Sequence, residues 1–128
     1  MTSLASEAKE DGGKQVILVT GGSGMVGRAC EAIVEAERAE GALTGDQEWV
    51  FLSSKDGDLR NFEETKAIFE RHKPTHCLHL AAFVGGLFRN LKYKVEFYRH
   101  NTLMNDNVLE CCRIYEVRRP FPSLVIRC

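Results

Sequence analysis

The stretch VILVTGGSGMVG, residues 16–27, decides the fold. Residues 16–20 are continuously apolar or β-branched, which is typical of a parallel strand buried on both faces. Gly21, Gly24 and Gly27 follow, and an amphipathic pattern predicts a helix from Gly24 to about Ala39. A strand, a glycine turn and a helix in this order are the context of a dinucleotide-binding fingerprint. The alternative is a tight turn that binds nothing.

Each glycine has a distinct use in such a fingerprint. The first permits a tight turn, the second lets the backbone approach a pyrophosphate, and the third lets the helix pack closely on the strand. The N-terminus of the helix then offers free N–H groups and a positive dipole to the phosphates.

The rest of the chain alternates strands with helices, which predicts βαβ units and a parallel sheet. Asn61 and Glu64 resemble a capping box that opens a helix running to about His72, and Pro74 stops this helix. The other predicted elements are strands at 49–53 and 76–80, a glycine-containing loop at 83–94, a helix at about 95–117 and a possible short strand within 121–128.

These elements predict an α/β protein, a Rossmann-like doubly wound parallel sheet that is incomplete. We expect a disordered leader at 1–15, the N-terminal part of a dinucleotide-binding domain at 16–117, and an atypical tail at 118–128. Pro120 and Pro122 in that tail would interrupt a central strand.

The composition narrows the class of partner. The chain has 17 basic and 18 acidic residues and a net charge of -1, which argues against nucleic acid. No apolar run is long enough for a membrane span, and the polar N-terminus lacks a secretory signal core. Five cysteines without CxxC spacing, and four histidines without ligand spacing, predict reduced thiols in a cytoplasmic protein and no metal site.

The residues after the second strand bear on the choice of cofactor. NAD-binding enzymes usually place an acid there for the ribose 2′-hydroxyl. Here the chain reads Ser53-Ser54-Lys55, and two hydroxyls with a cation suit a 2′-phosphate. This favours NADP(H), although Asp56 would favour NAD if it folds inward.

The spacing TGxxGxxG at 20–27 resembles the extended short-chain dehydrogenase/reductase superfamily. HLAA at 79–82 looks like the end of that superfamily's fourth strand beside the cofactor, and in GDL at 57–59 Asp58 looks like the aspartate that contacts adenine. The cofactor-binding residues that this resemblance and the fingerprint imply are Gly21, Gly22, Ser23, Gly24, Met25, Val26, Gly27, Ser54, Lys55, Asp56, Asp58, Leu59, Leu80, Ala81 and Ala82.

Residues 81–110 are similar to the GDP-L-fucose synthase family. The resemblance runs from about 15 to 117, and its most specific positions are Val84, Gly85, Gly86, Asn90, Phe97, Asn101, Asn105 and Asn107. It implies an NADP-dependent 3,5-epimerase and 4-reductase that makes GDP-L-fucose from GDP-4-keto-6-deoxy-mannose, and a homodimer formed through helices of this domain. The positions expected to meet the nucleotide-sugar substrate are Val84, Gly85, Gly86, Arg89 and Asn90; a solvated loop is the alternative for Arg89.

Asn101, Asn105 and Asn107 form an unusual group for a helix. Asparagine is a poor helix former, so the group indicates hydrogen-bonding work, with an exposed helix surface as the alternative. Asn101 and Asn105 share a face, whereas Asn107 lies on another.

The reductase step in the superfamily uses a Ser or Thr with a Tyr-x3-Lys pair, and this sequence contains no Tyr-x3-Lys. We therefore assign no catalytic residue and expect a truncated form without turnover. The alternative is a non-catalytic NADP(H)-binding fragment or regulator.

Overall fold

The computed structural model describes residues 13–43, 46–117 and 119–121. Its strands and helices, in chain order, are β1 (Gln15–Thr20), α1 (Met25–Ala39), β2 (Gln47–Phe51), α2 (Phe62–His72), β3 (His76–His79), α3 (Leu87–Lys92), α4 (Lys94–Ile114) and β4 (Arg119–Phe121). No helix in these ranges combines the length and the apolar character that crossing a membrane requires.

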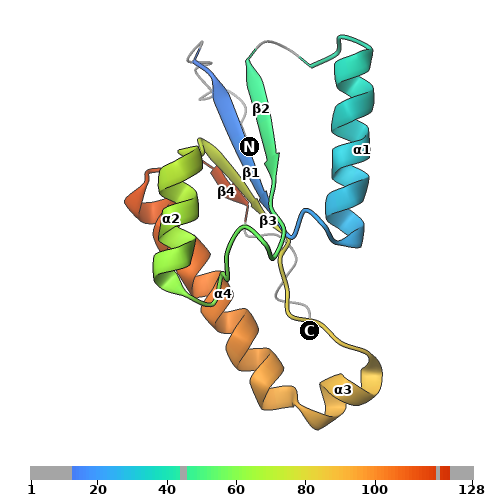
Figure 1. The fold of residues 1–128 in the computed structure, drawn as a ribbon, viewed down its shortest axis with the longest axis vertical. Coiled ribbons are helices and arrows are strands. Elements are labelled where there is room, and N and C mark those ends of the chain that lie inside the picture. Colours follow the sequence, from blue (N-terminus) through green and yellow to red (C-terminus); the bar gives the residue numbers. More distant parts are fainter. Residues whose placement is uncertain (1–12, 44–45, 118, 122–128) are drawn as a thin grey trace, which may run out of the picture.

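The four strands form one parallel sheet in the order β2-β1-β3-β4 (Figure 1). In its central strand β1, Ile17 pairs with Trp49 on one side and with His76 on the other. Helix α1 covers one face of the sheet, whereas α2 and α4 cover the other (Figure 1). Helices on both faces confirm the predicted doubly wound α/β fold.

The connections leave β1 and β3 in opposite directions across the sheet. From β1 the chain passes through α1 to β2, and from β3 it passes through α4 to β4 on the other side. In open parallel sheets such a switch point opens a crevice at the carboxyl ends of the strands. The fold therefore places a binding crevice where Thr20 and His79 end their strands.

The core lies between the sheet and the pair α2 and α4. Its buried side chains include Leu18, Phe69, Cys77, Val108 and Cys111. On the other face, α1 buries only Gly27 and Val34, and its apolar Met25, Val26 and Ile33 are exposed. The amphipathic pattern correctly predicts that α1 is a helix. In the described part of the chain, however, most of the apolar side chains on this helix remain exposed.

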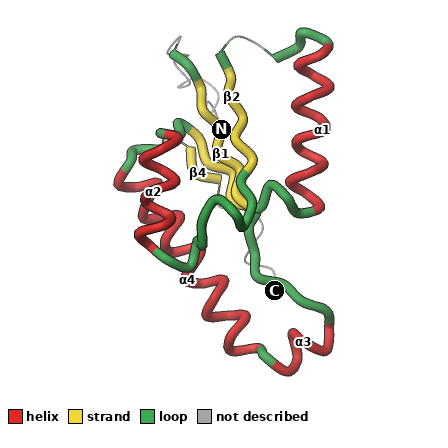
Figure 2. Tube along the Cα trace, viewed as in Figure 1, coloured by secondary structure: helices red, strands yellow, loops and turns green. Residues whose placement is uncertain are grey.

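Several predicted boundaries move. Strand β2 lies two residues earlier than expected, because Leu52 and Ser53 already belong to the turn that follows it. The loop predicted at 83–94 contains α3 (Figure 2), and the long helix starts one residue early and ends at Ile114. Gln15, which was assigned to the leader, already pairs in β1, and residues 1–12 lie outside the described residues.

The prediction that Pro120 interrupts a central strand was wrong. Pro120 lies within β4, opposite Cys77 of β3, and β4 is at the edge of the sheet formed by the described residues. An edge strand tolerates proline because its outer N–H needs no partner strand. Pro122 and the strand predicted from it onward fall outside the described residues.

The start of α2 has half of the predicted capping box. The Asn61 side chain accepts hydrogen bonds from the backbone N–H groups of Glu63 and Glu64. The N–H of Asn61 donates to the carbonyl of Asp58 rather than to Glu64. At the other end, Lys73 takes the left-handed conformation, with φ of 46°, before Pro74.

Candidate functional site

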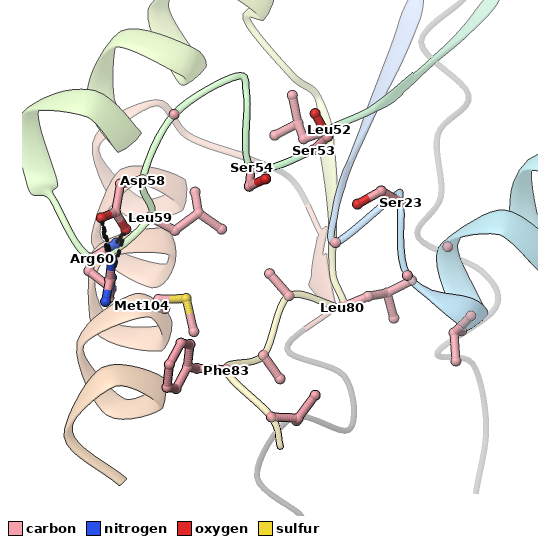
Figure 3. Close-up of a pocket in the computed structure, with 18 of the residues that line it drawn as sticks. Ser23, Leu52, Ser53, Ser54, Asp58, Leu59, Arg60, Leu80, Phe83 and Met104 are labelled. Atoms are coloured by element: carbon pink, nitrogen blue, oxygen red, sulfur yellow. Dashed lines mark hydrogen bonds and ion pairs between the residues drawn. The ribbon is translucent and has the colours of Figure 1, made fainter. Parts of the chain in front are cut away.

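A cavity of about 640 Å³ lies at the switch point between β1 and β3 (Figure 3). Its volume is in the range of a small-molecule or cofactor site. The lining comes from the glycine turn and the start of α1, the segment after β2, the segment after β3, and one residue each from α2 and α4. The lining residues are Gly21, Ser23, Gly24, Met25, Val26, Gly27, Leu52, Ser53, Ser54, Gly57, Asp58, Leu59, Arg60, Ile68, Leu80, Ala81, Ala82, Phe83, Val84 and Met104.

The glycine turn is closed by backbone packing. Gly21 has a φ of 69°, in the left-handed region, and a β-carbon there would lie 2.7 Å from the nitrogen of Ala81. A β-carbon at Gly27 would lie 2.4 Å from the Gly21 oxygen. The turn and the close helix–strand contact predicted for these two glycines are therefore confirmed.

The first turn of α1 faces the cavity through Met25, Val26 and Gly27. Its N-cap is Gly24, which offers no side-chain acceptor, and its first turn contains no acidic residue. The first N–H groups of a helix lack intrahelical partners, and the dipole there is positive. This cradle of uncapped N–H groups beside two close-packed glycines fits a diphosphate.

A buried hydrogen-bond chain joins the ends of β1 and β3. The Thr20 hydroxyl oxygen accepts from the N–H groups of Leu80 and Ala81, at 3.1 and 3.2 Å, so its hydrogen donates to Nδ1 of His79, 2.6 Å away. His79 Nε2–H then donates to Oδ1 of Asn105 at 2.8 Å. Burial lowers the pKa of His79, which keeps the ring neutral.

The asparagines of α4 hold two walls of the cavity. The Asn101 side chain accepts from the N–H of Phe83 at 2.7 Å and donates to its carbonyl at 2.9 Å. The Asn107 side chain donates to the carbonyl of Leu59 at 2.9 Å. With Asn105 bonded to His79, all three asparagines do the hydrogen-bonding work that was predicted, and Asn101 and Asn107 are buried rather than exposed.

The turn after β2 is organised by Asp56. Its carboxylate accepts from the N–H of Ser53 at 2.7 Å and from the Ser53 hydroxyl at 3.3 Å. Ser53 and Ser54 line the cavity, whereas Lys55 and Asp56 are exposed and lie outside the lining. Gly22 is also outside it, because this residue is buried against Phe51 and Leu52.

The residues expected to meet a nucleotide sugar mostly lie beyond the cavity. Val84 lines it, but Gly85 and Gly86 precede α3, and Arg89 and Asn90 are exposed on that helix. The remaining predicted cofactor residues, Gly21, Ser23 to Gly27, Ser54, Asp58, Leu59 and Leu80 to Ala82, are all brought together in the lining.

The predicted site residues do not include seven of the lining residues, which are Leu52, Ser53, Gly57, Arg60, Ile68, Phe83 and Met104. Arg60 binds Asp58 through Nε at 3.0 Å and Nη2 at 2.9 Å, and this pairing holds the pKa of the Asp58 carboxyl below its usual value. Asp58 and Arg60 are separated by one residue, and this spacing of an acid and a base could have predicted that Arg60 pairs with Asp58. Met104 lies one helical turn from Val108, and that spacing marks the inward face of α4.

The comparisons with known proteins agree with this geometry. Residues 17–123 match the NAD dependent epimerase/dehydratase family, and the chain belongs to that family.

Within the family, the chain is similar to GDP-L-fucose synthases. It is 51% identical over 104 residues to the GDP-L-fucose synthase of Dictyostelium discoideum, covering 81% of this chain and 31% of the relative. It is 51% identical over 94 residues to a probable GDP-L-fucose synthase of Drosophila melanogaster, covering 73% of this chain and 28% of the relative.

A solved structure is also similar. The GDP-L-fucose synthetase of Naegleria fowleri bound to NADP superposes with a TM-score of 0.72 and 49% identity, over 83% of this chain and 30% of that one. The chain thus spans less than a third of the length of these relatives.

Proposed function

We propose that this chain binds NADP(H) in the cavity between β1 and β3. The observation that carries the proposal is the pairing of the close-packed Gly21–Gly27 turn with the uncapped start of α1. The backbone N–H groups of this turn would hold the diphosphate, and Asp58 and Leu59 would lie at the adenine end. The bound group would supply hydride chemistry.

Two features support a 2′-phosphate over a free 2′-hydroxyl. The Asp56 carboxylate, the one acid that would favour NAD, is already engaged by the N–H and hydroxyl of Ser53. The Ser54 hydroxyl faces the cavity, and the Lys55 cation follows directly. NADPH should therefore bind more tightly than NADH, and Lys55→Ala should narrow that preference.

Calorimetric titration with NADPH tests the proposal. Gly24→Asp places a negative charge where the diphosphate would lie and should abolish saturable binding. Gly13→Asp adds the same charge at an exposed position with open space around it, and should bind like the unaltered chain. No heat of binding from a chain with a cooperative thermal transition would overturn the proposal.

For the whole activity, we propose that this region is the cofactor-binding part of a cytoplasmic enzyme of the GDP-L-fucose synthase type. Such an enzyme would epimerise C3 and C5 of a GDP-4-keto-6-deoxy sugar and reduce its C4 carbonyl. The chain contains no Tyr-x3-Lys to donate the proton in that reduction, so by itself it should not consume NADPH. Sustained loss of NADPH absorbance with GDP-4-keto-6-deoxy-mannose would contradict the expected lack of turnover. The second candidate function is a non-catalytic NADP(H) binder.

We also propose that α4 contributes to a homodimer. Its exposed apolar side chains Val95, Tyr98 and Leu109 lie within a narrow sector of the helix, away from the buried Val108 and Cys111. Sedimentation equilibrium of the unaltered chain and of Tyr98→Glu would test this, and equal monomer masses for both would contradict it.

A further inference from the structure

Asp58 and Arg60 form a fork-shaped ion pair on one wall of the cavity (Figure 3). Arg60 Nε lies 3.0 Å from Oδ1 and 3.2 Å from Oδ2 of Asp58, and Nη2 lies 2.9 Å from Oδ2. The backbone N–H of Arg60 also donates to Oδ1, at 2.9 Å. The pair closes a short turn, so it is set by local geometry rather than by a distant partner.

The guanidinium is supported from a second direction. Its carbon lies 5.9 Å from the centre of the Phe83 ring, a cation–π distance. The backbone of Phe83 is itself held by two hydrogen bonds with the Asn101 side chain of α4: its N–H donates to Oδ1, and its carbonyl accepts from Nδ2. The wall is therefore organised before any ligand arrives, which lowers the entropy cost of binding there.

The hydrogen bonds decide what this wall offers to a ligand. Each carboxylate oxygen can accept about two hydrogen bonds. Three N–H groups of Arg60 bond the carboxylate: the backbone N–H to Oδ1, Nη2–H to Oδ2, and the single Nε–H, which is shared between Oδ1 at 3.0 Å and Oδ2 at 3.2 Å. Three hydrogens leave the two oxygens together with room for about one further donor. The guanidinium retains N–H groups that Asp58 does not use. The pair thus presents one acceptor beside donors, with little net charge.

We propose that Arg60 determines base specificity at this end of the cavity. An acceptor beside a donor complements the edge of adenine, whose 6-amino group donates while N1 accepts. The same wall opposes a 6-oxo purine, in which the 6-position accepts and N1–H donates. A free carboxylate would instead accept two donors from guanine. This inference rests on the proposed binding of NADP(H), and it adds a residue and a discrimination to that function.

A phosphate ligand is the competing role for Arg60. The bidentate bond to Asp58 offsets the charge of the guanidinium and occupies two of its donors, which makes it a weak phosphate site. The two roles differ in what they predict. A phosphate contact strengthens every dinucleotide equally, whereas the base contact changes the ratio between two bases.

The test compares NADP⁺ with deamino-NADP⁺, which differ only in that the adenine is replaced by hypoxanthine. That change inverts the donor and acceptor at positions 6 and 1 and leaves the phosphates intact. The unaltered chain should bind NADP⁺ about tenfold more tightly than deamino-NADP⁺, because one well-formed pair of hydrogen bonds distinguishes two bases by about this factor. In Arg60→Ala the ratio should fall to within about threefold.

Arg113→Ala is the matched control. Arg113 forms a similar fork with Glu110, through bonds of 2.9 and 2.7 Å, but on an exposed part of α4 outside the cavity lining. Its loss should leave the ratio unchanged. Should Arg60→Ala not fold, Arg60→Gln removes the fork while keeping much of the side chain, and carries the same expectation.

Three results would overturn the inference. Equal binding of the two dinucleotides by the unaltered chain would show that the site does not discriminate between the bases, while the proposed binding of NADP(H) would stand. An unchanged ratio in Arg60→Ala, with both affinities lowered, would assign Arg60 to phosphate instead. Binding of neither dinucleotide by a folded chain would overturn the proposed function, and the inference with it.

Discussion

The turn from Gly21 to Gly27 and the arch formed by residues 81–92 both border the cavity, yet they are held in different ways. In the turn, backbone meets backbone, and a β-carbon at Gly27 would lie 2.6 Å or less from Gly21 and Gly22 atoms. In the arch, Asn101 on α4 fixes Phe83 through two hydrogen bonds, and beyond it Leu87 and Phe88 are 70% and 83% exposed.

The contrast concerns how much freedom each wall keeps. A wall in which backbone atoms contact one another directly has a single arrangement, because close-packed protein interiors are hardly compressible. A wall held by a few side-chain amides can open locally at the cost of those bonds. The turn is thus the more rigid of the two walls, and the arch is the wall that local opening can disturb at the cost of a few hydrogen bonds.

The largest expected effect is at Gly27. Gly27→Ala puts a methyl group 2.4 Å from a backbone oxygen, and we expect a loss of about 3 kcal/mol or more in the free energy of unfolding. Urea denaturation measures it. Gly86→Ala in the arch is the matched control, because nothing lies within 4 Å of its β-carbon position. Its expected loss is only that of replacing the glycine N-cap of α3 by alanine, about 1 kcal/mol or less. Similar losses for both variants would break the comparison.

The arch should respond next to Asn101. Asn101→Ala removes bonds to Phe83 N–H, to its carbonyl and to the Phe97 carbonyl, and leaves those groups without this partner. We expect a loss of about 1–3 kcal/mol and weaker NADPH binding. Asn90→Ala, which removes one exposed bond to Gly85, should cost less than about 0.5 kcal/mol. An unchanged NADPH affinity in Asn101→Ala would show that the arch does not shape the site.

The same contrast separates what the sequence revealed from what it concealed. The glycine turn was predictable because its constraint is local: three glycines between a strand and a helix allow few arrangements. The parallel sheet followed from the alternation of strands and helices. The partners of Asn101 and Asn107 were not predictable, since these bonds join residues 18 and 48 positions apart along the chain.

Arg60 shows a different limit. Its bond to Asp58 is local, but its contact with the Phe83 ring joins segments far apart in the sequence and depends on how Asn101 of α4 holds Phe83. The edge position that lets β4 include Pro120 likewise depends on the order of the strands. Both features depend on packing between segments far apart in the sequence, and patterns of neighbouring residues do not predict such packing.

His79 lies between the two regions: its ring bonds Thr20, which precedes the turn, and Asn105 on α4. Burial depresses the pKa of the folded ring below its ordinary 6.5, so the unfolded chain binds the proton first as the pH falls. The stability that the neutral ring provides is complete above about pH 6.5 and declines below it, by at most about 1.4 kcal/mol per pH unit. Urea denaturation between pH 7 and pH 5 should show this decline.

His79→Gln separates this ring from the other histidines. The amide keeps polar atoms near Thr20 and Asn105 but does not titrate in this range. The variant should be less stable at pH 7, and its stability should vary less between pH 7 and pH 5. A slope as steep as that of the unaltered chain would mean that His79 is not the group responsible.

The smallest expected effect refines the comparison within glycine itself. A β-carbon at Gly85 would lie 2.9 Å from the Phe97 ring tip, a contact as short as several at the turn, but the neighbour is a side chain rather than backbone. Because Phe97 packs against Phe83 with ring centres 5.0 Å apart, both rings can shift together. Gly85→Ala should therefore cost about 1 kcal/mol, far less than Gly27→Ala. If it costs as much, the arch is as rigid as the turn, and the division between a fixed wall and an adjustable one fails.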